Sequence, residues 1–511
     1  MLTKVENNWT LAEAAHLLNR AGFGGSPAEI KALHAKGRIE AVNFLITSKD
    51  GPDAFPLPNW ATRAQAIADA QARVAQRREI MEATRGMTPE KAEQTRREAF
   101  RKVQQLGRQQ TQDGQGWWFH RLAHTQAPLR EKMTLFWHDH FATSIQKVRQ
   151  PALMMLQNEM FRSMAMGNFK ELTQAILLDP AMLLYLDTEN SRKGKPNENF
   201  AREVMELFTL GEGNYTEEDI RQAARAFTGY QINRMNGSVV HNRRQWDGTP
   251  KTIFGKTGPF DGKDVINLIF EKPGVATFLA KKIWEYFVYG DPPDKAVEAL
   301  GRILRDANYE VEPLLREIFL AKEFYSEKAV RTQIKSPVQF TVQILKQLEI
   351  GSAPGGFAAR AQQELGQVLF MPPNVAGWDW GQGWINTNTL LTRYNLAGFI
   401  TKGAEDVRFA GGKGGKGGKG EKPRGMGGAF KNRGRGWDGP DYDKIAPPAL
   451  RGKPEELVDA LIFRFFQGPV PDKARGLFIE YANTKKDESF TGKEIAELCH
   501  LMLSTPYYQL C

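Results

Sequence analysis

The stretch "PNENFAREVMELFTLGEGNYTEEDIRQAARAFTGY", Pro196–Tyr230, contains two helical segments separated by a glycine-containing turn. In the first segment, apolar residues such as Phe200 and Val204 recur at helical spacing and form one core-facing side. Thr216 and Asp219 have the spacing of a capping box, which predicts the start of the second segment. The stretch therefore predicts a pair of short amphipathic helices and, for the chain, a mainly α fold.

Helix signals recur throughout the other parts of the sequence. In "SPAEIKALHAKG", Ser26 is a cap, Pro27 takes the first helical position and Gly37 ends the helix. We therefore expect one large multi-helix domain over residues 1–401. A short group of C-terminal helices, residues 449–511, should pack back onto it.

Residues 62–122 are rich in Ala, Gln, Arg and Glu. The pattern breaks only at "RGMTPEK", where Thr88 and Pro89 restart a helix. This pattern predicts a long helical hairpin that projects as an arm. Its charged surface is either simply solvated or binds a partner.

One β signal interrupts the helices. In "GYQINRMNGSVVHNRR", Asn236-Gly237 separates two short alternating runs, which predicts a small β-hairpin over residues 229–243.

The net charge of +10 over 511 residues is concentrated in one segment. Residues 411–436 hold eight basic side chains and one acidic one, or +7, which leaves +3 for the remaining chain. Such glycine-rich composition predicts a flexible, disordered basic insertion over residues 402–448. It is either an exposed spacer or a segment that binds a polyanion, and the near-neutral remainder disfavours nucleic acid as a partner.

Cysteine content and hydropathy bear on the compartment. Cys499 and Cys511 are the only cysteines, which are too few for a disulfide framework or a thiolate metal site. No apolar run reaches the length that crosses a bilayer, so we expect no membrane span. The N-terminus shows no export signal, and we expect a cytoplasmic protein while leaving export open.

Four of the eight histidines fall within 21 residues, around "FWHDHFATS", Phe136–Ser144. Histidine nitrogens are common ligands of divalent metals, so His138 and His140 are candidate metal ligands. The two lie about 200° apart on a helical wheel and can share a metal only if the helix ends near Trp137. Otherwise they are core or capping histidines that bond to the backbone, the reading that also applies to His120 and His124.

A polar stripe borders the core face of the helix that begins the opening stretch. It consists of Asn199, Glu203 and Glu206, with Arg202 just beyond. Carboxylates beside a buried seam can hold a metal or act as an acid–base pair. The alternative is that these carboxylates form salt bridges with nearby arginines.

The segment "LFMPPNVAGWDWGQGWINTNTLLTRYN" combines tryptophans with amides on a loop. Asn374, Trp378, Trp384 and Asn386 offer flat apolar faces and hydrogen-bonding groups, which suits a sugar or another polar ring. The alternative is a loop that plugs the helical core. No P-loop, nucleophile elbow, HExxH or dinucleotide motif occurs.

Long stretches of the sequence resemble the DUF1800 family, a bacterial domain of unknown function. They include "LLNRAGFGGSP", "LREKMTLFWHDHFATS", the opening stretch, "PPNVAGWDWGQGWINTNTLLTRYN" and "STPYYQLC". The resemblance implies a mostly helical protein with no assigned reaction, often found beside a family that looks like sulfatases and phosphatases, and sometimes exported. The family pattern matches at His138 and His140 and at the Asn199 helix. Where it commonly has a His-Asp pair, this chain has Trp246-Asp247.

These observations lead to three functional hypotheses. The first is a metal-assisted hydrolase or modifying enzyme that unites the histidines with the Asn199 helix, uses a divalent metal, and acts on a polar polymer such as a glycan. The second is a non-catalytic binding or assembly protein for a partner, such as a sulfatase-like protein. The third is polyanion binding through the basic insertion.

Overall fold

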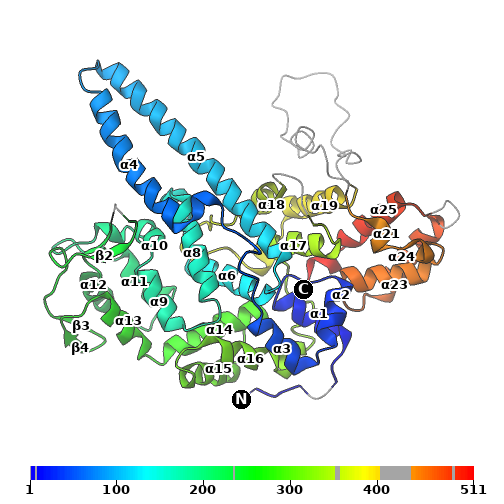
Figure 1. Ribbon diagram of the computed structural model, residues 1–511. Helices are drawn as coiled ribbons and strands as arrows, with labels where there is room; N and C mark the ends of the chain where they lie inside the picture. Colours follow the sequence, from blue (N-terminus) through cyan, green and yellow to red (C-terminus); the bar gives the residue numbers. More distant parts are fainter. Residues whose placement is uncertain (1, 6–7, 234–235, 352–356, 403–438, 486–489) are drawn as a thin grey trace.

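The computed structural model describes residues 2–5, 8–233, 236–351, 357–402, 439–485 and 490–511. These residues form a helical body from which two long helices project (Figure 1). Strands are confined, in the described ranges, to two two-stranded sheets. The predicted mainly α class is therefore confirmed. No helix within these ranges has the length and hydropathy needed to cross a membrane.

Three short helices open the chain and pack against the first core. Their bounds are α1 (Leu11–Arg20), α2 (Pro27–His34) and α3 (Arg38–Thr47). The capping box predicted at Ser26 is present, because Ser26 Oγ accepts from the backbone of Glu29 and the Glu29 carboxylate accepts from Ser26. Gly37, at φ +76°, precedes α3.

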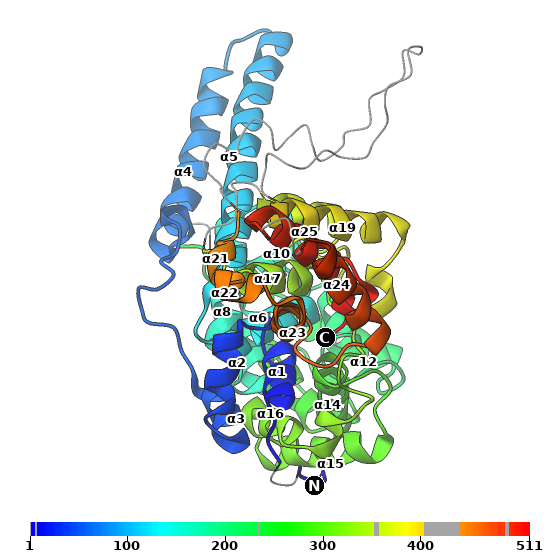
Figure 2. The same ribbon diagram turned by 90° about the vertical axis from the view of Figure 1, so that its right-hand side faces the viewer.

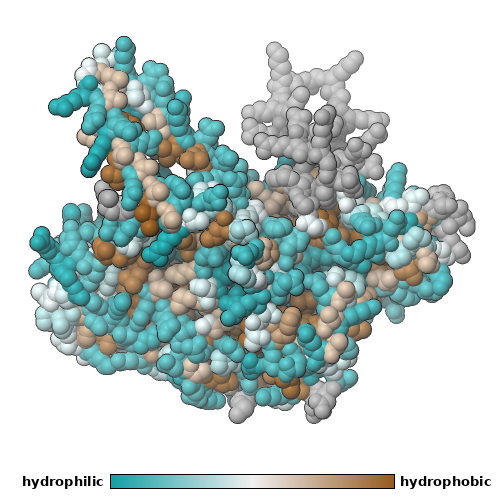
Figure 3. All heavy atoms as spheres, in the orientation of Figure 1, coloured by the Kyte–Doolittle hydropathy of each residue, from teal (hydrophilic) through white to brown (hydrophobic). Residues whose placement is uncertain are grey.

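The predicted arm is formed by α4 (Arg63–Ala83) and α5 (Pro89–His124), after the short η1 (Asn59–Ala61). Both views show the pair standing clear of the body (Figures 1 and 2). The base is anchored because Trp118 and Leu122 are fully buried. Farther out, apolar residues lie among hydrophilic ones on the arm's surface (Figure 3).

The middle of the chain builds the first hydrophobic core together with the N-terminal helices. The elements of this middle part are α6 (Pro128–His140), α7 (Ile145–Val148), α8 (Pro151–Ser163), α9 (Phe169–Leu177), α10 (Pro180–Tyr185), η2 (Thr188–Asn190), α11 (Asn199–Glu206), α12 (Glu217–Ala226), α13 (Gly262–Phe270), α14 (Gly274–Phe287), α15 (Asp294–Asp306), α16 (Val311–Phe319) and η3 (Lys322–Tyr325). Of these, α7 packs in the second core through Ile145 and Val148.

The C-terminal part builds a second core around α17 together with the base of the arm. Its elements are α17 (Pro337–Gln347), α18 (Phe357–Leu365), η4 (Gly381–Trp384), α19 (Thr387–Lys402), α21 (Tyr442–Ile445), α22 (Pro448–Arg451), α23 (Pro454–Phe465), α24 (Asp472–Lys485), α25 (Gly492–Leu503) and η6 (Pro506–Gln509). Of the predicted insertion, residues 403–438 lie outside the described part. In the rest of it, Ile445 and Ala446 are buried.

The predicted hairpin is present, since β1 (Tyr230–Ile232) pairs antiparallel with β2 (Val239–His241). A second hairpin, β3 (Lys251–Ile253) with β4 (Lys256–Gly258), was not predicted. Its two-residue turn is Phe254-Gly255, both at positive φ. The sequence cue failed because Asn, Asp or Gly normally occupies the first position of such a turn.

Helix α6 connects the two cores. Its Phe136 packs in the first core and its Leu135 in the second. The last turn of α6 therefore lies at the junction between the two halves of the body, where polar side chains have room to gather.

Candidate functional site

A cavity of about 850 Å³ lies at this junction, between α6, α14, the segment before α17 and the tryptophan-rich loop. Its wall is amphipathic, with aromatic rings interleaved among charged groups. The lining residues that matter below are Lys132, Asp139, His140, Lys282, Glu285, Gln339, Trp378, Trp380 and Trp384.

Asp139 lies in the cavity wall at the last turn of α6. Its Oδ1 accepts a 2.8 Å hydrogen bond from the backbone N–H of Trp378. The preceding residue is Gly377, at φ +91°, where a Cβ atom would come within 2.3 Å of Asp139 Oδ1. Only glycine therefore lets the loop approach the carboxylate so closely.

The environment of Asp139 favours its protonated form. Burial raises the pKa of the carboxyl group to about 7, although the Trp378 amide, the charge of Lys282 and the Trp380 indole each act to lower it. A carboxyl group that is half ionised near neutral pH can both donate and accept a proton. The same shift in a cavity wall is typical of functional sites.

The two predicted metal ligands, His138 and His140, lie on different sides of α6. His138 Nε2 accepts a 3.2 Å hydrogen bond from Phe370 N–H, whereas His140 Nε2 lies 3.0 Å from the Phe208 carbonyl and must donate to it. The two rings are thus opposite tautomers, and burial lowers the pKa of both, that of His138 to about 3. This is the core-histidine arrangement that sequence analysis left open.

A metal would find few free donors here. His140 Nδ1 is buried and has no hydrogen-bond partner among the described residues, so this ring nitrogen is open to a ligand. Among the residues that the structure describes, no group of three or more His, Cys, Asp or Glu is arranged to hold a metal ion.

The polar stripe on α11 does not line the cavity. Arg202 forms two hydrogen bonds with Glu217, of 2.9 and 2.7 Å, and Glu206 accepts one of 2.7 Å from the Tyr215 hydroxyl. Arg202 therefore pairs with Glu217 and Glu198. Among the described residues, neither Glu203 nor Glu206 forms the salt bridge with an arginine that the alternative reading expected.

The remaining residues of the stripe also face away from the cavity. Asn199 Nδ2 lies 3.4 Å from the Leu186 carbonyl. Glu203 is half-buried, and burial raises its pKa. The end of α11 reaches the site only through its backbone, because the Leu207 carbonyl accepts a 3.0 Å bond from Lys282 Nζ.

The predicted substrate-binding residues divide into two groups. Trp378 and Trp384 line the cavity and are largely buried. Asn374 instead accepts from the Ala376 amide, and Asn386 bonds with the Thr389 amide, where α19 begins. These two asparagines therefore shape the loop.

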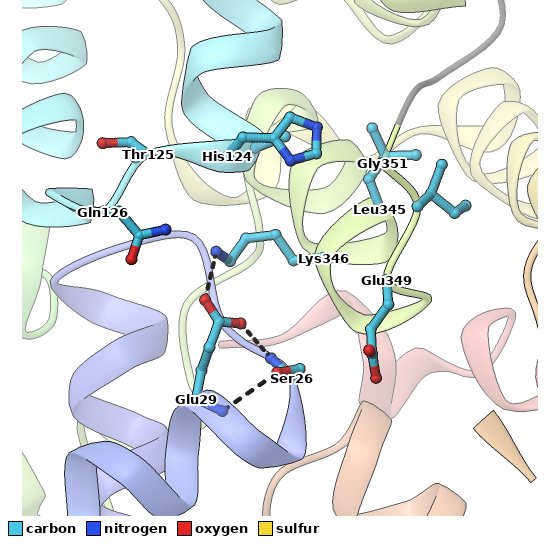
Figure 4. Close-up of a pocket in the computed structure, with 11 residues that line it drawn as sticks. Ser26, Glu29, His124, Thr125, Gln126, Leu345, Lys346, Glu349 and Gly351 are labelled. Carbon is cyan, nitrogen blue, oxygen red and sulfur yellow. Dashed lines mark hydrogen bonds and ion pairs between the residues drawn. The ribbon is translucent and has the colours of Figure 1, made fainter. Parts of the chain in front are cut away.

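A smaller hollow of about 220 Å³ lies beside α2 and α17 (Figure 4). Its main charges already satisfy one another. Lys346 forms a 3.0 Å ion pair with Glu29, which also binds Ser26, and Glu349 pairs with Arg464. The large cavity is therefore the better candidate for a ligand.

The chain matches the model of one known protein family. The model of a family described as "Protein of unknown function (DUF1800)" matches residues 16–510. The chain belongs to the DUF1800 family. The resemblance noted in the sequence is thereby confirmed, and the DUF1800 match spans every residue that lines the cavity except Cys511. No curated protein and no solved structure matches this DUF1800 chain.

Several cavity residues of this DUF1800 protein were not predicted from the sequence, above all Asp139, Lys282 and Trp380. The signal for Asp139 was present, because it stands between the two histidines in "FWHDHFATS". The segment predicts a site, but the ligand chemistry of histidine points to His138 and His140 and not to the carboxylate between them. Lys282, on α14, has no motif around it that could have found it.

Proposed function

We propose that this DUF1800 protein is an enzyme that acts on a polar polymer such as a glycan, with the large cavity as its active site. The observation that supports this most is the position of Asp139. Its carboxyl group, with a pKa of about 7, lies in the same cavity wall as Trp378, Trp380 and Trp384. The group that could transfer a proton and the aromatic rings that could hold a polar ring thus lie in the same cavity wall.

The chemistry divides among these groups as follows. The tryptophan rings stack against the apolar face of a sugar, and Asp139 donates a proton to the oxygen of the bond that breaks. Glu285 is a second carboxylate of the cavity, and burial raises its pKa as well. Most glycosidases use such a pair, one carboxyl group as the acid and the other as the base that takes a proton from the attacking water or as the nucleophile, and we assign the second role to Glu285.

The metal-assisted form of this proposal assigns His138 and His140 as ligands and the α11 stripe as catalytic. Of these, His140 is the residue whose position supports a role, because it lines the cavity and its Nδ1 is free. A divalent metal would reach the site through this nitrogen. Elemental analysis of the purified protein, compared with His140→Gln, tests that version.

The experiment for the central proposal uses a panel of neutral and charged polysaccharides and measures the release of reducing ends. Asp139→Asn keeps the size of the side chain and an acceptor for the Trp378 amide, but it cannot transfer the proton. We expect turnover to fall at least about a hundredfold while binding persists. Asp53→Asn, an exposed aspartate near the arm's base, is the matched control. Unchanged turnover in Asp139→Asn would exclude the proposed role.

A second candidate function is assembly with a partner protein, such as a sulfatase-like one. The observation that favours it is the arm, where Phe100, Val103 and Leu106 are 56, 43 and 57% exposed within seven positions of α5. Exposed apolar residues on a projecting helix pair suit a protein contact. Light scattering of the purified chain mixed with a purified sulfatase-like protein tests this. Complex formation that Phe100→Ser and Leu106→Ser leave intact would contradict it.

A further inference from the structure

Four cationic side chains are buried together beside the cavity. They are Arg20 on α1, Lys132 on α6, Lys335 before α17 and Arg393 on α19, with 2, 8, 2 and 1% of their surface exposed. Four elements distant in sequence supply them, and an electrostatic interaction with Cys511, a residue of the cavity wall, acts to raise the pKa of all four. We call these four residues the basic cluster.

The basic cluster lacks compensating anions. None of its members forms an ion pair with an Asp or Glu of the described residues. When all four side chains are protonated, the basic cluster therefore holds four positive charges within one buried region. Burial lowers the pKa of Lys132 to about 8 and that of Lys335 to about 7.

Donors are also left unused. Arg20 Nη2 donates to the carbonyls of Val288 and Ala329, at 2.7 and 2.6 Å. Its Nε and Nη1, and Nε of Arg393, are buried with no hydrogen-bond partner in the described structure. Buried charges that have no ion-pair partner and whose donors are only partly satisfied cost free energy, and an oxyanion nearby would offset this cost through charge-assisted hydrogen bonds.

Lys132 connects the basic cluster to the cavity. Its Nζ lies 2.5 Å from Oε1 of Gln339, and both residues line the cavity. We propose that this end of the cavity binds an oxyanion group of the substrate, a carboxylate, sulfate or phosphate, with Lys132 and Gln339 in contact and Arg20 behind them. This inference rests on the proposed function, in which a ring of the substrate stacks on the tryptophans. The charged substituent of that ring then reaches Lys132.

Thermal unfolding of the full chain at pH 7 tests this, with sodium sulfate, phosphate and acetate compared against sodium chloride at equal ionic strength. A bound ion raises the midpoint in proportion to ln(1 + [L]/Kd). We expect at least one oxyanion to raise it beyond chloride, and the most effective ion identifies the substituent. Lys132→Gln should weaken that ion's affinity at least about tenfold, and Lys263→Gln, an exposed lysine on α13, should not.

Gln339→Glu is the second variant, in case Lys132→Gln does not fold. It keeps the side-chain size but sets a carboxylate beside Lys132, so it should also abolish the oxyanion effect. Equal midpoints in all four salts, or an effect that both cavity variants retain, would overturn the proposal. Retained turnover of neutral polysaccharides would then leave the proposed function standing. If oxyanions bind but no polysaccharide is turned over, the oxyanion subsite is supported and the proposed function is contradicted.

Discussion

The backbone N–H of Trp378 donates a 2.8 Å hydrogen bond to Oδ1 of Asp139, across 239 positions of sequence. This bond fixes the tryptophan loop to the last turn of α6. It thereby sets the distance between the group proposed to transfer a proton and the rings proposed to hold the substrate.

Gly377→Ala should break this junction. At φ +91° an added Cβ would lie 2.3 Å from Asp139 Oδ1 and 2.8 Å from the Asp139 carbonyl oxygen, so the loop must move away. We expect a loss of about 1–3 kcal/mol in the free energy of unfolding, measured by denaturant titration, together with loss of glycan binding. Gly381→Ala, at φ +57° with open space around its Cβ, is the control and should keep binding.

The raised pKa of Asp139 predicts a pH dependence of stability. The folded state holds the proton up to about pH 7, whereas the unfolded state releases it near 3.8, so folding is favoured below pH 4 and loses this contribution as the pH rises to 7. The side chain at this position of the Asp139→Asn variant is always neutral. The free energy of unfolding of this variant, relative to the wild type, should therefore rise between pH 4 and 7 by up to about 4 kcal/mol. Lys282 and Tyr286 face the carboxyl group and are unchanged in both proteins.

Denaturant unfolding at several pH values from 4 to 8 measures this difference. Asp53→Asn should follow the wild type throughout. A constant difference between Asp139→Asn and the wild type over the whole range would mean that Asp139 titrates normally in the folded state.

The tautomers of the histidines can be observed directly. We expect long-range ¹H–¹⁵N spectra to show His138 protonated at Nδ1 and His140 at Nε2, because of their bonds with Phe370 N–H and the Phe208 carbonyl. Both rings should stay neutral down to at least about pH 5, since burial lowers their pKa. A shared tautomer, or titration near pH 6.5, would disprove this arrangement.

Trp380→Ala should separate binding from folding. Trp380 is 51% exposed, so its loss should change the free energy of unfolding by less than about 1 kcal/mol while glycan affinity falls about tenfold. Losing the indole donor should also raise the pKa of Asp139 further, since that bond lowers it. Phe100→Ala, an equally exposed aromatic on α5, should affect neither quantity.

The fold was predictable where local signals suffice. The capping boxes at Ser26 and Thr216, the break before Pro89 and the Asn236-Gly237 turn all act through neighbouring residues, and each element formed as expected. The turn at Phe254 gave no signal, because its positive φ is imposed on a residue type that rarely adopts it.

The site was predictable only as segments. "FWHDHFATS" and the tryptophan loop are both visible in the sequence. Which of His138, Asp139 and His140 line the cavity, however, depends on a loop more than 200 positions later. The roles assigned to Glu203 and Glu206 stay predictions. A helical wheel shows that they border the core-facing side of α11. It cannot show that the cavity lies between α6, α14 and the tryptophan loop, away from their side chains.

Glu131 should be the acid on which the body depends most. It is fully buried, accepts 3.0 and 3.1 Å bonds from Arg162 and Trp118, and pairs with Arg121 at 2.8 Å. Glu131→Gln removes the carboxylate that Arg121 and Arg162 share, which leaves Arg121 only Asp50 and Arg162 only Glu159 as ion-pair partners within the described part of the chain. It should cost about 3–5 kcal/mol of unfolding free energy. Glu217→Gln, at the surface, should cost less than about 1 kcal/mol. If denaturant unfolding shows that Glu131→Gln and Glu217→Gln lower the free energy of unfolding by similar amounts, this prediction is wrong.

The most direct test of the central claim is the titration of the Asp139 carboxyl group, followed by ¹³C NMR in selectively labelled protein with Asp139→Asn to assign the signal. We predict a midpoint near pH 7, which would establish a proton-transferring group in the wall of the cavity. A midpoint near 4 would mean that Asp139 is an ordinary carboxylate, and the account of the cavity as an acid–base site would fall.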